Sequence, residues 1–194
     1  AHERVVLWFV DNSEILPARL FTLYSSEAAL AEAAGTRGPD IQLVLQSLTG
    51  RREWSLKVAY DAQQLAQHAG AVSTEVARMD AEIAAATPGR RYLLERKRAD
   101  LVKTEVSGAA RGLAGELLSQ LREHAEDARM LPAASGDTQG NVVLNAALLV
   151  HRERETALRA AAEQLAAQHT ALGMIVSFSG PWGPYRFLDD HVDS

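Results

Sequence analysis

The chain of 194 residues contains no cysteine, which excludes disulfide bonds, thiolate catalysis and cysteine-based metal sites. It has no apolar run near the roughly 20 residues that a membrane-spanning helix needs, and its first residues lack a signal-peptide pattern. The formal net charge of −5 at pH 7 gives no electrostatic attraction for nucleic acid or anionic lipid. These absences predict a cytoplasmic protein whose partners are other proteins, with no nucleic acid and no membrane among them.

Catalytic motifs are also missing, since the sequence has no dinucleotide fingerprint, no P-loop, no zincin motif and no nucleophile elbow. The six histidines are scattered, and none in a helical segment has a second histidine one turn away. A C-terminal group could chelate a divalent ion but is more typical of a solvated terminus: Asp189, Asp190, His191 and Asp193. We therefore expect no enzyme, no cofactor, no metal site and no small-molecule substrate.

Residues 180–187 (GPWGPYRF) form the most distinctive segment, with two prolines, two glycines and three aromatics in eight positions. The prolines fix the backbone and remove two donors, while the aromatics carry large apolar area at little rotamer entropy. Such a segment cannot continue a helix or an inner strand and indicates a shaped surface. It packs either on the last strand of this chain or on another protein, and the candidate partner-binding residues are Trp182, Pro184, Tyr185 and Phe187.

The first sixty residues predict a mixed α+β domain. Residues 2–10 suit a short helix or a buried strand equally on periodicity, and residues 15–24 predict a strand. Ser25 or Ser26 should cap a helix that ends at Gly35 and Gly38, and Asp40 should cap a second one through Leu48. Residues 54–60 alternate as a strand that presents Trp54, Leu56 and Val58 on one face.

Residues 62–130 are rich in alanine, glutamate, arginine and leucine and predict two helices, broken at Thr87, Pro88 and Gly89. Each carries a seam with 3–4 spacing: Leu65, Ala69, Val72, Val76, Met79 and Ile83 in the first, and Ala99, Val102, Val106, Ala109 and Leu113 in the second. We expect a long antiparallel hairpin, with intermolecular coiled-coil pairing as the alternative. Three glycines weaken the second helix unless close packing uses them, which we expect: Gly108, Gly112 and Gly115.

After a loop at 132–140, the pattern predicts a strand at 142–150, a helix at 153–171 and a strand at 174–178. This order suits a split β-α-β unit. The fold class is therefore α+β, a ferredoxin-like sheet carrying a long helical hairpin. We expect an N-terminal domain over 1–60 and a C-terminal domain over 61–194, the latter with the hairpin at 62–130 and a β-α-β unit plus tail at 141–188.

Five segments together resemble the GvpL/GvpF family of gas vesicle proteins, in the family's order and rough spacing. They are LPAR at 16–19, REWSLKV at 52–58, PGRRYLL at 88–94, NAALLV at 145–150 and GPWGPYRF at 180–187. Gly183 departs from the family's pattern, which has a second consecutive proline there. Members normally begin with further strands, so we expect the N-terminal domain of this chain to lack the first of them.

The resemblance implies an α+β domain related to the ferredoxin fold together with a helical coiled-coil domain. It also implies a non-enzymatic accessory protein that binds the small hydrophobic shell subunit, supports gas vesicle formation and is found in the cytoplasm and at the gas vesicle. Other accessory proteins are further expected partners. The alternative function is a ferredoxin-like regulatory module that binds a small molecule between its sheet and its helical hairpin.

Overall fold

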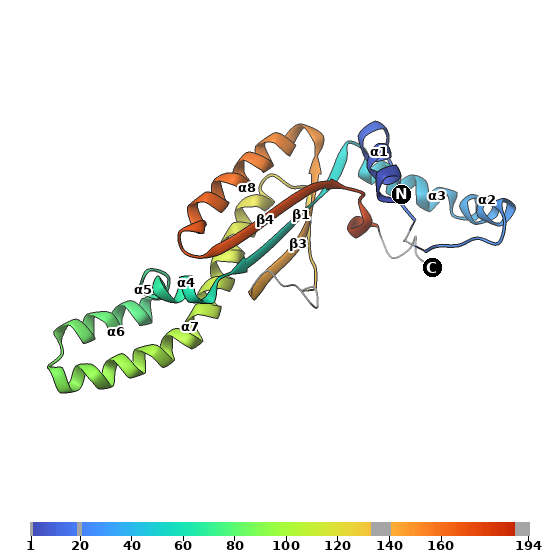
Figure 1. Ribbon diagram of the computed structural model, residues 1–194. Helices are drawn as coiled ribbons and strands as arrows, with labels where there is room; N and C mark the ends of the chain where they lie inside the picture. The colour runs from blue at the N-terminus through green and yellow to red at the C-terminus, as the bar shows by residue number, and fades with distance from the viewer. Residues whose placement is uncertain (1, 19–20, 133–140, 189–194) are drawn as a thin grey trace.

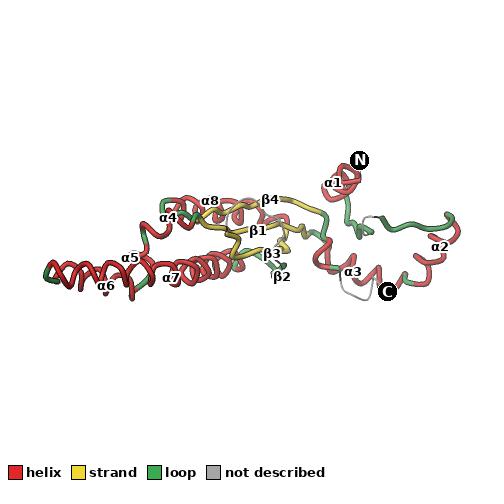
Figure 2. The backbone as a smooth tube through the Cα atoms, turned by 60° about the horizontal axis from the view of Figure 1, so that its bottom comes forward, coloured by secondary structure: helices red, strands yellow, loops and turns green. Residues whose placement is uncertain are grey.

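The computed structural model of the chain describes residues 2–18, 21–132 and 141–188. The molecule is elongated, with a four-stranded sheet in its middle (Figure 1). Three helices lie at one end, namely α1 (His2–Asn12), α2 (Glu27–Thr36) and α3 (Gly38–Leu48). The opposite end is formed by α6 (Thr74–Ala85) and the first turns of α7 (Pro88–Arg122), while α8 (Glu155–Thr170) lies along the sheet (Figure 2).

The sheet contains β1 (Arg51–Tyr60), β2 (Asp127–Met130), β3 (Asn141–His151) and β4 (Met174–Trp182) in the order β2-β3-β1-β4. Every neighbouring pair is antiparallel, and Leu56 of β1 lies opposite Ala146 of β3 and Phe178 of β4. The strands predicted at 54–60, 142–150 and 174–178 are confirmed. The last one continues to Trp182, because an edge strand tolerates a proline that an inner strand would exclude.

One face of the sheet is covered by α7 and α8 and holds the larger core. Trp54, Leu56 and Val58 share this face as predicted, and they are 4%, 0% and 0% exposed. Their helical partners are fully or almost fully buried: Val102, Val106, Ala110, Ala114, Leu117 and Leu121 from α7, with Leu158, Ala162 and Leu165 from α8. The packing of two helices on one face buries every apolar position that alternates to that side of β1.

The opposite face carries a second, smaller core at the end of the sheet nearest the N-terminal helices. Ala147 and Leu149 of β3 point to this face, because they alternate with the residues of the larger core. Val44 and Leu48 of α3 pack on them together with Phe187 and Leu188. The C-terminal tail and α3 therefore cover this part of the sheet jointly.

Of the two capping signals predicted for the N-terminal helices, one is confirmed and the other is wrong. Residues 2–12 form α1, which resolves the helix-or-strand alternative in favour of the helix. Ser26 caps α2 as predicted, since its Oγ accepts from the backbone of Ala29 at 3.1 Å. The cap of α3 is Arg37, with Pro39 in the first turn, so the prediction of Asp40 at that cap is wrong.

The strand predicted at 15–24 is also wrong, because the described residues of this segment, 15–18 and 21–24, are irregular structure with a turn at Phe21. Pro17 has no backbone donor for a ladder. Leu16 packs instead against the second core. Of the loop predicted at 132–140, residues 133–140 lie outside the described residues, as do the acidic residues and histidine after 188.

The helical region differs from its prediction in three ways. Its first part is divided into α4 (Ala62–Gln67), α5 (Ala69–Val72) and α6, and Ser73 caps α6 by accepting from Val76 at 3.4 Å. The second helix ends at Arg122 rather than near 129, because residues 127–130 pair with β3 as β2. Its buried stripe steps from Val102 to Val106 and Ala110, since a straight helix drifts from a strict heptad; Ala99 is exposed.

Close helix packing does not explain the three glycines of α7. A Cβ atom built at Gly108, Gly112 or Gly115 would have no neighbouring atom within 4 Å, so that expectation is wrong. Gly180 of β4 is the opposite case. Its φ of +151° is rarely adopted by other residues, and a Cβ there would lie 2.9 Å from the ring of Trp54.

The two glycine environments give opposite predictions for alanine. Gly112→Ala should raise the free energy of unfolding by about 1 kcal/mol, because alanine is the better helix former and meets no clash. Gly180→Ala should lower it by about 1–3 kcal/mol through backbone strain, with the clash against Trp54 adding to the loss. Urea unfolding followed by circular dichroism measures both. A loss of stability in Gly112→Ala would show that close packing uses this glycine after all.

Candidate partner-binding site

The segment that links β4 to the tail passes closely over Trp54. Trp182 lies opposite Glu53 in the sheet register, and the register shifts between Glu53 and Ser55. The Gly180–Pro181 peptide bond is cis. The indole Nε1 of Trp182 donates to Ser179 Oγ at 3.3 Å, which keeps the polar end of this half-buried side chain satisfied.

The tail then turns through a short 3-10 helix, η2 (Tyr185–Phe187), and sends Phe187 into the second core. Phe187 is 5% exposed, and the guanidinium carbon of Arg129 lies 5.1 Å from the centre of its ring. A cation over an aromatic face is attracted by the ring's quadrupole. Phe187 is therefore held by apolar contacts on the sheet and by a charge from β2.

Both backbone groups of Arg186 are bound by side chains of the sheet. Its N–H donates to Glu53 Oε2 at 2.9 Å, and its carbonyl accepts from Arg129 Nη1 at 2.8 Å. These bonds fix the peptide units between Tyr185 and Phe187, whereas the Arg186 side chain itself is exposed. The edge strand β2 and the central strand β1 thus position the same turn.

Glu53 is a buried carboxyl group, only 6% exposed. Desolvation raises its pKa from 4.5 to about 7, and the hydrogen bond from Arg186 together with the charges of Arg186 and Arg129 lowers it only in part. Because the folded-state pKa lies above the unfolded one, ionisation of Glu53 opposes folding. The stability lost to this group grows as the pH rises from about 4.5 and is complete above about 7.

Glu53→Gln should remove this pH dependence, because the amide remains neutral and its Oε1 can still accept from Arg186. The difference in unfolding free energy between variant and wild type should increase by up to roughly 3 kcal/mol in the variant's favour from about pH 5 to about pH 8. Urea titrations of both proteins across this range measure the difference. A difference that stays constant with pH would show that Glu53 has an ordinary pKa.

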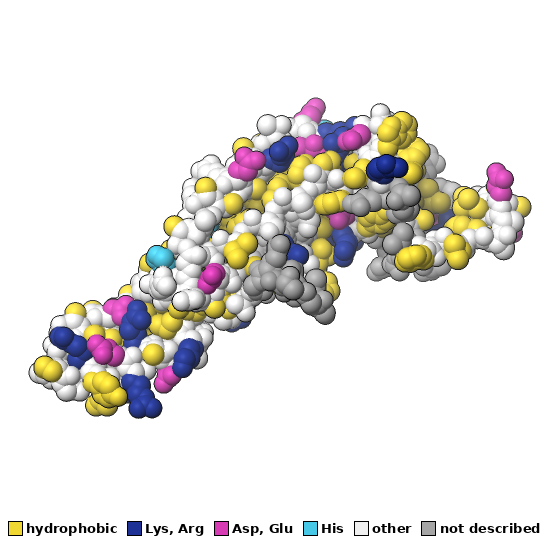
Figure 3. All heavy atoms as spheres, viewed as in Figure 1, with side chains coloured by type: hydrophobic (Ala, Val, Ile, Leu, Met, Phe, Trp, Pro, Cys, Tyr) yellow, Lys and Arg dark blue, Asp and Glu magenta, His cyan; other side chains and the backbone are white. Residues whose placement is uncertain are grey.

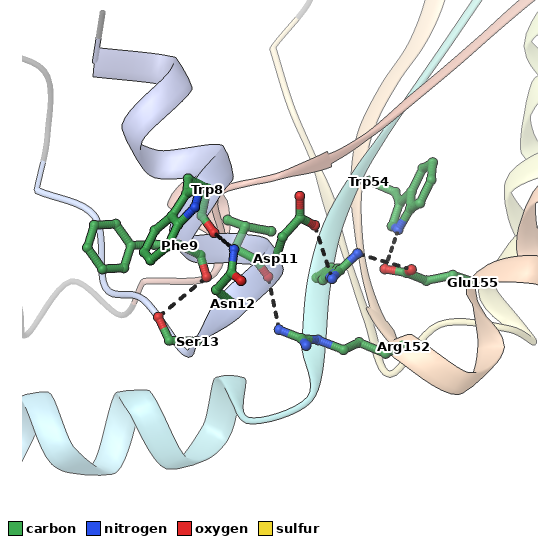
Figure 4. A network of polar contacts seen from close by, with 10 residues as sticks. Trp8, Phe9, Asp11, Asn12, Ser13, Trp54, Arg152 and Glu155 are labelled. Carbon is green, nitrogen blue, oxygen red and sulfur yellow. Dashed lines mark hydrogen bonds and ion pairs between the residues drawn. The ribbon is translucent and has the colours of Figure 1, made fainter.

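The N-terminal helix α1 is tied to the same end of the sheet (Figure 4). Arg152 Nη2 donates to the carbonyl of Val10 at 2.9 Å, which places a cation at the C-terminal end of the helix. Arg52 bridges Asp11 at 3.2 Å and Glu155 at 3.5 Å. Glu155 in turn accepts from Trp54 Nε1 at 3.3 Å, so one polar network joins α1, β1 and the start of α8.

The structure divides the four candidate residues of the tail into two pairs. Pro184 and Phe187 are buried against the rest of the chain, and a Cβ added at Gly183 would lie 2.7 Å from Val6 of α1. Trp182 and Tyr185 are half-buried and retain accessible surface. The tail therefore packs on its own chain, and Trp182 and Tyr185 are the two candidates available for contact with a partner.

The sequence analysis did not predict a second apolar surface beside the tail, which we call the arm groove. It is a depression of about 330 Å³ lined by residues 16–18, by α2 and α3, and by the tail residue Leu188: Leu16, Pro17, Ala18, Thr22, Tyr24, Leu30, Ala33, Ala34, Arg37, Ile41 and Leu188. Phe21 and Leu23 are 87% and 90% exposed in the segment that contributes to it. Apolar side chains gather at the end of the molecule formed by α2 and α3 (Figure 3). The sequence feature that could have indicated this surface is the apolar content of residues 15–24, which we interpreted as a strand.

The family model for gas vesicle synthesis proteins GvpL/GvpF matches residues 1–189. The chain belongs to this family. Gas vesicle protein L2 of Halobacterium salinarum is 24% identical to it over 216 residues, which cover 97% of this chain and 73% of the relative. The resemblance carried by the five sequence segments is thereby confirmed.

Two crystal structures of family members share the fold. The gas vesicle protein GvpF from Anabaena sp. aligns with a TM-score of 0.71 at 16% identity, covering 97% of this chain and 75% of that one. GvpF from Microcystis aeruginosa aligns with a TM-score of 0.68 at 18% identity, covering 97% and 76% respectively. At these identities the likeness establishes the mixed helix-and-sheet fold of this GvpL/GvpF chain.

Three of the family segments occupy defined places in the structure. REWSLKV lies in β1, NAALLV lies in β3 and PGRRYLL begins α7.

No described helix is long and apolar enough to cross a membrane. Within the described ranges, no group of three or more histidine or acidic residues is arranged to hold a metal ion.

Proposed function

We propose that this GvpL/GvpF protein binds the hydrophobic shell subunit of the gas vesicle and supports vesicle formation without catalysing a reaction. Family membership supports the gas vesicle role. The observation that carries the binding proposal is the arm groove, an apolar depression to which Thr22 and Tyr24 contribute, next in sequence to the exposed side chains of Phe21 and Leu23. A subunit with exposed apolar surface needs a temporary cover until it joins the growing shell, and a groove of this composition can provide it.

The tail extends this binding surface. Leu188 lines the groove and also belongs to the second core, so the groove begins where the tail leaves the sheet. We assign Trp182 and Tyr185 as contact residues next to it, and Pro184 and Phe187 as residues that hold the tail in place. The bonds from Glu53 and Arg129 to Arg186 then act on binding indirectly, by positioning the turn.

We also propose a fold class and a division into domains. The order β-α-β-β-α-β and the antiparallel arrangement β2-β3-β1-β4 support a ferredoxin-like sheet domain, with α6 and α7 as a helical extension. Because β1 pairs with β3 and β4, we place the boundary between an N-terminal helical domain and the sheet domain before Arg51 instead of after Tyr60. The small-molecule alternative required space between the sheet and the helices of 62–130, and buried side chains such as Leu56 and Leu117 occupy that space.

Capture of the shell subunit tests the proposal. The wild-type chain should retain tagged subunit on an affinity column and reduce light scattering by the subunit in solution. Phe21→Ser/Leu23→Ser and Trp182→Ala/Tyr185→Ala should each weaken capture about tenfold or more, because each removes two apolar contacts from one binding surface. Binding is measured by co-purification and by titration of the scattering signal.

The control is Tyr92→Ala/Leu93→Ser, which also removes two exposed apolar side chains, 66% and 61% exposed, but from the first turns of α7, away from the groove and the tail. This variant should capture the subunit as the wild type does, and all variants should unfold cooperatively. Loss of capture in the control alone would place the binding surface on the helical extension. No capture by the wild-type chain would contradict the proposed function.

A further inference from the structure

The edge strand β4 is unprotected in a way that β2 is not. Edge strands are usually shielded from further pairing by charged residues, prolines, bulges or short length. At the other edge, β2 has four residues and carries Asp127 and Arg129. In β4, residues 174–180 have neither a charge nor a proline, and β1 is the only described strand that pairs with it. Figure 1 shows β4 running along the outer edge of the sheet.

The two faces of β4 differ, and both are accessible along the edge. Ile175, Ser177 and Ser179 are exposed on one face. On the other, Val176 and Phe178 are half-buried beside an open cleft of about 350 Å³ between β4 and α8. Phe178 stacks on Trp54 with ring centres 5.0 Å apart, which supports the floor of this cleft.

We propose that β4 pairs with β4 of a second copy of this chain, antiparallel about a two-fold axis at Ser177, to form one continuous eight-stranded sheet. Ser177 is the midpoint of the uncharged, proline-free stretch 174–180. Antiparallel pairing about this point uses the whole stretch and leaves Pro181 outside the new ladder. Two-fold dimers are the commonest oligomers, and they require a surface that is complementary to itself.

The side chains of β4 satisfy that requirement. In this register Val176 lies opposite Phe178 of the second copy, and the axis repeats this pair of a β-branched and an aromatic residue, which is a favourable cross-strand combination. Ile175 lies opposite Ser179, and Ser177 lies opposite itself. No like charges meet within the ladder, because residues 174–180 carry none.

The rim of the cleft fits the same partner. Arg159 and Glu163 line it from α8, and both are exposed. They are one turn apart, yet no ion pair joins them in the structure. The two-fold axis reverses the direction of α8 in the second copy, so each rim presents a cation and an anion in opposite order. This arrangement favours a second copy over a partner whose charges do not match those of Arg159 and Glu163.

The absence of cysteine allows a direct test of the register. In Ser177→Cys the introduced thiol is the only one in the chain, and the proposed pairing places it opposite its own copy. Mild oxidation or a short bismaleimide crosslinker should therefore convert most of the protein to a covalent dimer. Ser119→Cys, an exposed position on α7, is the matched control and should stay largely monomeric.

Sedimentation velocity over a range of concentrations tests the association itself. The wild-type chain should shift from the 21.0 kDa monomer to twice that mass as concentration rises. Ser177→Lys should remain monomeric throughout, because it sets two like charges directly opposite each other. Ser119→Lys adds the same charge elsewhere and should dimerise as the wild type does. Circular dichroism checks that each variant is folded.

Three outcomes would overturn the inference. A wild-type chain that is monomeric at every concentration, or a dimer that persists in Ser177→Lys, would exclude pairing through β4. A monomeric wild type whose capture of the shell subunit is lost in Ser177→Lys would instead assign the edge to a strand of that subunit. The dimer does not depend on the proposed function, so failure of capture leaves this measurement intact.

Discussion

The central position of β1 is the constraint on which the rest of the structure depends. It pairs with β3 on one side and with β4 on the other, and both partners come from the C-terminal half of the chain, after the helices α4 to α7. Its residues alternate between two cores: Leu56 and Val58 meet α7 and α8, while Glu53 faces the tail. β1 therefore contributes to the larger core and binds the tail through Glu53, while β3 supplies the floor of the second core and β2 supplies Arg129.

The buried carboxyl group of Glu53 shows how this strand organises the tail. A charge in this place costs stability, which is why its pKa is raised to about 7. The group nevertheless positions the tail, because it accepts the N–H of Arg186 while Arg129 binds the carbonyl of the same residue. The prolines and Gly180 let the chain leave β4 over Trp54, and Phe187 closes the second core.

Local signals predicted much of the fold, and long-range pairing decided the rest. Alternation identified β1, the run of apolar residues at 142–150 identified β3, and Ser26 identified the start of α2, since each signal depends on neighbouring residues. The end of α7 could not be read locally, because residues 127–130 are a strand only when β3 is beside them. The tail residues were recognisable as a packing segment, but their burial was not, since it depends on α1 and α3, far away in sequence.

Exposed apolar surface promotes aggregation. The two apolar surfaces discussed above, the arm groove and the cleft along β4, share no lining residue. The arm groove is lined by residues 16–18, Thr22, Tyr24, residues of α2 and α3, and Leu188, and none of these lining residues belongs to β4. The cleft along β4 is lined by residues of β1, α8 and β4, and none of these residues lines the arm groove. Pairing through β4 would thus cover the unprotected edge while leaving the groove open. A chain with this division could pair with itself and still receive an apolar partner, because the two proposed contacts would use different side chains.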